Sequence, residues 1–231
     1  MQHVRCVVFD AVGTLIHSAE PVEKTYASVG RRFGSTIDQL TVRRRFKSAF
    51  REALKSQHDL KTSEEDEHRF WADVVASVFT DTDHKTQTSI LNELWQHFAT
   101  PSAWRLYDDV VPTWNSIHEL GIGIAIGSNF DSRLHAVMSG LTAGSHVATV
   151  FDSASVGFRK PAREFFLQLE RSLHLEPKQL LMVGDNPLAD VQGAIDSDWN
   201  AQLIDRAEHT SQATRSVTSL SQIFDMLAGS H

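Results

Sequence analysis

The chain has 231 residues, which suits one large domain or a core with a smaller partner and is enough for a sizeable buried core. Its 29 acidic and 22 basic residues give a formal net charge of -7, so nucleic-acid backbones and anionic membranes are repelled overall. The apolar segment before Asp10 is too short for a signal peptide or a membrane span. We therefore expect a cytoplasmic protein with neither a nucleic-acid nor a membrane partner.

Four short apolar runs, each followed by a polar or glycine-containing turn, have the near-continuous hydrophobicity of buried parallel strands. They cover residues 6–10, 122–129, 180–186 and 201–205, and a weaker fifth run lies around residues 147–151. From residue 109 onward the runs alternate with helical patterns, one ending at Gly121 and another entered through Pro161. This alternation predicts an α/β fold with a doubly wound parallel sheet covered by helices on both faces.

Residues 17–100 break the alternation, because their apolar residues recur at helical spacing and no strand-like run interrupts them. The spacing is clearest at Phe46, Phe50 and Leu54, at Phe70, Trp71, Val74, Val75 and Val78, and at Ile90, Leu94 and Phe98. Ser63 followed by Asp66 is a candidate capping box at a helix start. We predict an all-helical cap over residues 17–100, inserted into a core that comprises residues 1–16 and 101–231.

Polar side chains stand at the carboxyl ends of three predicted strands: Asp10, then Ser128 and Asn129, then Asp185 and Asn186. In open parallel sheets, ligands bind at this edge, near the switch in strand order. Asp10 and Asp185 could share a hard cation such as Mg²⁺, which takes oxygen ligands. A metal held by only a few protein groups suits a phosphate substrate that supplies a further oxygen.

Two further charged residues can reach this edge. Lys160 lies just before Pro161, where an ammonium group could neutralise both Asp10 and a bound phosphoryl group. Asp190 follows Asp185 by five residues, about one helical turn, and could support the site indirectly or stabilise a helix start.

In this order, the four segments around Asp10, Ser128, Lys160 and Asp185 resemble the haloacid dehalogenase superfamily of hydrolases, from Val4 to about Asp205. The resemblance implies a Rossmann-like core with a helical cap. It also implies that Asp10 is the nucleophile and is covalently modified during turnover.

The same resemblance implies roles for the other residues. Ser128 and Asn129 would bind the transferred group, and Lys160 would orient and stabilise it. Mg²⁺ would be held by Asp10, Asp185 and the backbone carbonyl of residue 12. Thr14, of the motif DxxxT, and Asp190 would support these groups without contacting the substrate.

Val12 departs from the phosphatase pattern, in which a second aspartate at this position protonates the leaving group and then activates water. Its backbone carbonyl can still bind a metal. Loss of a general acid/base typically costs about 10²- to 10⁴-fold in rate, so we expect a slow phosphatase acting on a small phosphorylated metabolite. The rate of hydrolysis would fall least for acyl and aryl phosphates, because their leaving groups need less protonation.

Other interpretations remain open at this stage. The 2-haloacid dehalogenases read DAYGT where this chain reads DAVGT, but they need no metal and carry serine in place of Asp185. Phosphonate-cleaving relatives use a cap lysine, and nothing selects one here. A carboxylate beside Asp10 would repel it unless a cation lies between them, which favours Mg²⁺ and phosphoryl transfer.

Structural explanations exist for several of the same residues. Ser128 and Asn129 could cap a helix that begins near Asp131. The five tryptophans mostly fit apolar helix faces, where core packing is the expected role. A catalytically retired hydrolase could serve as a binding scaffold, although a buried charged cluster is costly for that purpose. We expect a monomer or homodimer.

Overall fold

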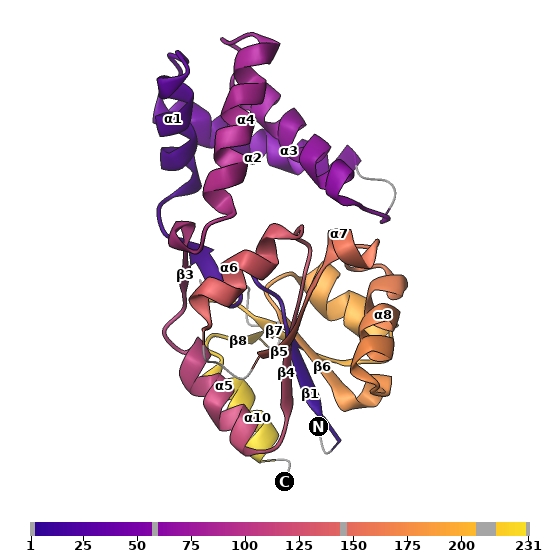
Figure 1. Ribbon diagram of the computed structural model, residues 1–231. Helices are drawn as coiled ribbons and strands as arrows, with labels where there is room; N and C mark the ends of the chain where they lie inside the picture. Colours follow the sequence, from indigo (N-terminus) through magenta and orange to yellow (C-terminus); the bar gives the residue numbers. More distant parts are fainter. Residues whose placement is uncertain (1–2, 57–59, 144–146, 207–215, 230–231) are drawn as a thin grey trace.

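The computed structural model describes residues 3–56, 60–143, 147–206 and 216–229, and Figure 1 shows their arrangement. Six strands form one sheet in the order β5-β4-β1-β6-β7-β8, and every neighbouring pair is parallel. The strands are β1 (Cys6–Phe9), β4 (Gly123–Ser128), β5 (Val147–Asp152), β6 (Leu180–Gly184), β7 (Asn200–Ile204) and β8 (Ser216–Val217). The predicted doubly wound parallel sheet is confirmed. The two-residue β8 was not predicted, because so short a segment carries no periodic signal.

Helices cover both faces of this sheet (Figure 1). They are α5 (Val110–Glu119), α6 (Arg133–Leu141), α7 (Ser153–Val156), α8 (Arg163–Leu173), α9 (Gly193–Asp196) and α10 (Ser221–Ala228), with short helices η1 (Pro101–Ala103), η2 (Pro177–Gln179) and η3 (Pro187–Gln192). Successive β1 side chains point to opposite faces. Val7 and Phe9 pack in one cluster with Trp114 of α5, and Val8 packs in another with Phe165 of α8. Among the described residues, no helix is both long and apolar enough to cross a membrane.

The four helices between β1 and η1 lie apart from the sheet and bury a hydrophobic cluster of their own (Figure 1). They are α1 (Val22–Arg32), α2 (Gln39–Ser56), α3 (Glu64–Val78) and α4 (His84–Phe98). Phe70, Val74 and Val78 of α3 are buried in this cluster, as their helical spacing predicts. Ser63 caps α3, since its hydroxyl accepts a hydrogen bond from the Asp66 amide at 3.2 Å.

Two short strands join the helical part to the sheet part, and only residues 17 and 18 of the first fall within residues 17–100, where no strand was predicted. β2 (Ile16–Ser18) and β3 (Trp104–Leu106) pair antiparallel, with Ile16 opposite Leu106 and Ser18 opposite Trp104. Three residues are too few to show a period-2 pattern. The two strands pair across a long separation in the sequence, so neither could be predicted from its own residues.

Candidate active site

Three parallel strands deliver polar side chains to one edge of the sheet. Asp10 directly follows β1, Ser128 is the last residue of β4, and Asp185 directly follows β6. Because β1 lies between β4 and β6, the three side chains meet where the chain switches from one side of β1 to the other. Ser128 Oγ donates a hydrogen bond to Asp10 Oδ1 at 2.9 Å, and both residues are buried.

Lys160 is the centre of the buried charged cluster, with only 2% of its surface exposed. Its Nζ donates to Asp10 Oδ1 at 2.9 Å, to Asp190 Oδ1 at 2.5 Å and to the Gly127 carbonyl at 2.7 Å. These three bonds use all three ammonium protons. Burial acts to lower the pKa of Lys160, but the charges of Asp10 and Asp190 outweigh it and hold this pKa above its ordinary value.

Asn129 positions Lys160 through two backbone hydrogen bonds. Its Oδ1 accepts from the Lys160 amide at 2.7 Å, and its Nδ2 donates to the Lys160 carbonyl at 2.9 Å. Neither Ser128 nor Asn129 caps α6, because that helix begins at Arg133 and the amide of Arg133 donates to Asp131. The helix-capping interpretation of these two residues is therefore wrong.

Three carboxylates face one another in the crevice. Asp10, Asp185 and Asp190 each offer an oxygen within 4.8 Å of the others. Partial removal of its carboxyl group from water, followed by the charges of Asp10 and Asp190, raises the pKa of Asp185 to about 7, although the residue as a whole is exposed. Burial is also the main reason that the pKa of Asp190 lies above its ordinary value. Asp190, expected from the sequence to act indirectly, contacts Lys160 and belongs to this cluster.

The cluster has the charge and the donor atoms that suit a divalent cation. When all three carboxylates are ionised, the Lys160 ammonium leaves two negative charges uncompensated, and the raised pKa of Asp185 reflects this repulsion in the absence of a cation. All the side-chain donors are carboxylate oxygens, which hard cations such as Mg²⁺ prefer. In the turn after Asp10, the amides of Thr14, Leu15 and Ile16 donate to Ala11, so these bonds leave the Val12 carbonyl unused.

Two glycines provide the space that the carboxylates occupy. Gly13 has a φ of +88°, a backbone conformation that favours glycine, and a Cβ at this position would collide with the Asp185 carboxylate. A Cβ at Gly184 would overlap the Asp190 carboxylate in the same way. The glycine in each segment thus lets a strand end and an acidic side chain approach closely.

Thr14 and Val12 occupy different environments in the turn after β1. Thr14 is fully buried, and its Oγ1 has no hydrogen-bond partner within the described ranges, while its carbonyl accepts from Arg206 Nε at 2.8 Å. The Val12 side chain is 39% exposed and lines a cavity next to the crevice. The structure therefore places Val12 at the site but brings Thr14 into no hydrogen bond with its carboxylates.

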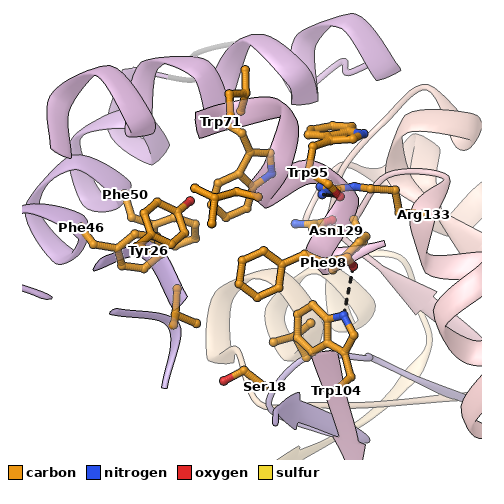
Figure 2. Close-up of a pocket in the computed structure, with 15 residues that line it drawn as sticks. Ser18, Tyr26, Phe46, Phe50, Trp71, Trp95, Phe98, Trp104, Asn129 and Arg133 are labelled. Atoms are coloured by element: carbon orange, nitrogen blue, oxygen red, sulfur yellow. Dashed lines mark hydrogen bonds between the residues drawn. The ribbon is translucent and has the colours of Figure 1, made fainter. Parts of the chain in front are cut away.

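The cavity beside Val12 lies between the helical part and the sheet part and has a volume of about 280 Å³ (Figure 2). Its described lining residues are Val12, Ser18, Val22, Tyr26, Phe46, Phe50, Trp71, Leu91, Leu94, Trp95, Phe98, Trp104, Asn129, Phe130 and Arg133. Three of the five tryptophans line this space, so the expectation that tryptophans serve mainly in core packing is only partly right. Trp71 and Trp95 lie on helices, where an apolar side chain usually packs in a core, and Trp104 lies in the three-residue β3, so their positions in the sequence do not indicate this role.

Arg133 lies at the end of the cavity nearest α6 and was not predicted. Its guanidinium group pairs with Asp131 through bonds of 2.7 and 2.6 Å. The same group stacks on the Trp95 ring, 3.5 Å from the ring centroid. Arg133 therefore connects α4 with the loop that follows β4.

Comparison with known proteins places the chain in a family. Residues 4–198 match the family model of haloacid dehalogenase-like hydrolases, and the chain belongs to that family of hydrolases. A curated relative is the mouse (Mus musculus) haloacid dehalogenase-like hydrolase domain-containing protein 3. It is 28% identical over 216 residues, which cover 92% of this chain and 86% of the mouse protein. The superfamily resemblance of the four sequence segments is thereby confirmed.

Solved structures share the fold at low sequence identity. A phosphatase of the same family from Thermococcus onnurineus has a TM-score of 0.67 at 21% identity, covering 98% of this chain and 99% of that one. A 2-haloacid dehalogenase from Pseudomonas syringae pv. Tomato has a TM-score of 0.69 at 18% identity, with the same coverage. The fold is therefore common to phosphatases and dehalogenases and does not distinguish between their reactions.

Proposed function

We propose that this hydrolase is a Mg²⁺-dependent phosphatase that uses Asp10 as its nucleophile. The observation that carries the proposal is the cluster of Asp10, Asp185 and Asp190 around a single buried ammonium group, Lys160. A dehalogenase that works without metal has no use for the excess negative charge beside its nucleophile. A phosphatase can use it to hold a cation at the place where a phosphate group arrives.

The hydrogen bonds around Asp10 indicate which of its oxygens would react. Oδ1 accepts from both Ser128 and Lys160, whereas no hydrogen bond from another described residue engages Oδ2. Oδ2 would attack phosphorus and form an aspartyl phosphate. Lys160 and Ser128 would meanwhile hold the carboxylate in place and offset the charge that builds up during the transfer.

Mg²⁺ would be held by Asp10, Asp185 and the Val12 carbonyl, and it would supply positive charge against the phosphoryl oxygens. The remaining steps need proton transfer, for which Val12 offers no side-chain group. We propose that the leaving group departs without protonation by the enzyme. Water then hydrolyses the aspartyl phosphate slowly, at a cost of about 10²- to 10⁴-fold relative to a site with a general acid/base.

We further propose that residues 17–100 act as a cap over a core of residues 1–16 and 101–231. Such a cap would exclude water from the crevice and select a small phosphorylated substrate. A cytoplasmic location and a monomeric or homodimeric state remain part of the proposal.

The direct test measures hydrolysis of acetyl phosphate and p-nitrophenyl phosphate with Mg²⁺ and with EDTA. We expect activity only with Mg²⁺, and a loss on the order of 10³-fold or more in Asp10→Asn. Asp196→Asn, at an exposed aspartate of α9, is the matched control and should retain full rate.

Two results would overturn the proposal. Full Mg²⁺-dependent activity in Asp10→Asn would remove the nucleophile assignment. Halide release from 2-haloacids in EDTA, without phosphatase activity, would establish the dehalogenase alternative. Absence of both activities would leave the binding scaffold as the remaining interpretation.

A further inference from the structure

We propose that the cavity beside Val12 binds the aromatic ring of a leaving group that carries no charged substituent, so that the substrates are small aryl phosphates. This inference rests on the proposed phosphatase function and adds the substrate class to it. The proposal begins with position: Val12 is two residues from Asp10, and Asn129 adjoins Ser128, which donates to Asp10. Asp10 and Lys160 do not line the cavity themselves, but Val12 and Asn129 connect it to their crevice, and we place the ester oxygen of a phosphate seated at Asp10 on that side.

The lining favours an apolar group without charge. Among the described residues that line the cavity, Arg133 alone is charged, and its guanidinium group is already paired with Asp131 and stacked on Trp95. Trp104 Nε1 is likewise occupied, since it donates to the Phe98 carbonyl at 3.1 Å, as the dashed line in Figure 2 shows. A charged substituent on the ring would lose its water here without gaining a free partner.

The shape and size of the cavity favour a ring. Aromatic side chains from α1, α2, α3 and α4 point into one space, together with Trp104 of β3 (Figure 2). Aromatic rings pack well on one another in tilted or edge-to-face contacts. A dry apolar cavity of about 150 Å³ already accommodates benzene, so about 280 Å³ has room for one substituted ring.

The absence of a general acid at position 12 favours the same class of substrate. When Asp10 Oδ2 forms its bond to phosphorus, the bond from phosphorus to the ester oxygen breaks, and the electron pair leaves on that oxygen. A phenol has a pKa of about 10, so phenolate can depart without a proton and take one from water afterwards. Water later cleaves the aspartyl phosphate, restoring the Asp10 carboxylate and releasing inorganic phosphate.

Val12 thus contributes in two ways. Its side chain forms part of the apolar wall, where an aspartate would place a charge or a polar hydroxyl. An aryl phosphate also needs the missing general acid less than an alkyl phosphate does, because phenolate is the better leaving group. The same substitution that weakens a general phosphatase would suit the site to this class of substrate.

The kinetic test compares kcat/KM for phenyl phosphate, which has a ring, with kcat/KM for acetyl phosphate, which does not. Val22→Phe adds a ring to the cavity wall at the start of α1. We expect it to lower the ratio of phenyl phosphate to acetyl phosphate activity by about tenfold or more. Val111→Phe, at a half-exposed position of α5, is the matched control and should leave the ratio unchanged.

A binding test needs neither turnover nor a cavity variant. Asp10→Asn is titrated by calorimetry with phenyl phosphate and with inorganic phosphate, both with Mg²⁺ present. We expect phenyl phosphate to bind about tenfold or more tightly, because only it places a ring in the cavity. Equal affinities for the two ligands would overturn the inference.

The outcomes separate the inference from the function on which it rests. If acetyl phosphate is hydrolysed and the activity ratio is the same in Val22→Phe and Val111→Phe, the cavity does not select the leaving group, while the phosphatase proposal stands. If neither phosphate is hydrolysed with Mg²⁺, the proposed function fails and the substrate class falls with it.

Discussion

Lys160 Nζ donates a 2.9 Å hydrogen bond to Asp10 Oδ1, although 150 residues separate them along the chain. The ammonium group is also fixed by Asp190 and by the Gly127 carbonyl, so it cannot swing away from the carboxylate. A charge held this rigidly in a buried site is suited to stabilising a charge that develops during reaction, because no reorganisation is needed.

Replacement of Lys160 tests this arrangement. Lys160→Met keeps the length of the side chain but leaves the Asp10 and Asp190 carboxylates buried without their partner. Breaking a buried ion pair in this way typically costs about 3–5 kcal/mol, and we expect a lower free energy of unfolding in urea together with loss of phosphatase activity. Lys178→Met, at an exposed position, should change neither quantity. An unchanged unfolding free energy in Lys160→Met would contradict the described contacts.

The raised pKa of Asp185 predicts how metal-free stability depends on pH. Because this pKa rises from 3.8 to about 7 on folding, the folded state holds a proton that the unfolded state releases. Stability is therefore lost as pH rises from about 4 to about 7. Asp185→Asn removes the cost of ionising this carboxyl group. Because Asp185 is exposed, solvent screens that cost, so in EDTA we expect Tm to rise by only about 1–2 °C at pH 8, with little change at pH 4.

With Mg²⁺ present, Asp185→Asn should lower Tm relative to the wild-type protein instead of raising it. The wild-type protein should gain Tm on addition of Mg²⁺ at pH 8, since a ligand that binds the folded state stabilises it. Asp185→Asn should lose most of this gain, whereas Asp196→Asn should keep it. A Mg²⁺ response in Asp185→Asn equal to that of wild type would exclude Asp185 as a metal ligand.

Val12→Asp tests whether the site lacks only its general acid. We expect hydrolysis of alkyl phosphates, whose leaving groups need a proton, to rise by up to about 10²- to 10⁴-fold. Hydrolysis of phenyl phosphate should rise less. Val12→Asn has a similar shape but cannot donate a carboxylic proton, so it should show no such gain. If Val12→Asp gains nothing with any phosphate, the binding scaffold becomes the better interpretation.

A buried ion pair connects the helical part with the loop before Lys160. Arg159 donates to Glu67 Oε1 of α3 at 2.7 Å and to Thr62 Oγ1 at 2.8 Å. Glu67→Ala should lower the free energy of unfolding by about 3–5 kcal/mol, because it leaves the Arg159 charge buried and without its carboxylate. Glu65→Ala, two residues earlier on an exposed face, should cost less than about 1 kcal/mol. Similar losses in the two variants would contradict the burial of this pair.

Five of the six strands of the sheet, and the residues at its carboxyl edge, could be predicted from the sequence alone, whereas the two-residue β8 could not. Buried parallel strands must be apolar along their length, so the strands and the positions of Asp10, Ser128 and Asp185 could be predicted locally. The four short motifs around Asp10, Ser128, Lys160 and Asp185 indicated the family by their order along the chain. The sequence also showed that Val12 occupies the position where the phosphatase motif has its second aspartate.

Which residues meet beyond that edge depends on contacts between distant segments of the chain, and these became visible only in the folded protein. Asn129 holds the Lys160 backbone, Asp190 contacts the Lys160 ammonium group directly, and β2 pairs with β3, all across long separations in the sequence. The aromatic cavity draws on residues from 12 to 133 that share no period. Helical spacing shows that an apolar side chain is covered, but not whether another helix or a ligand covers it. That is why three tryptophans could not be assigned to the cavity before the fold was known.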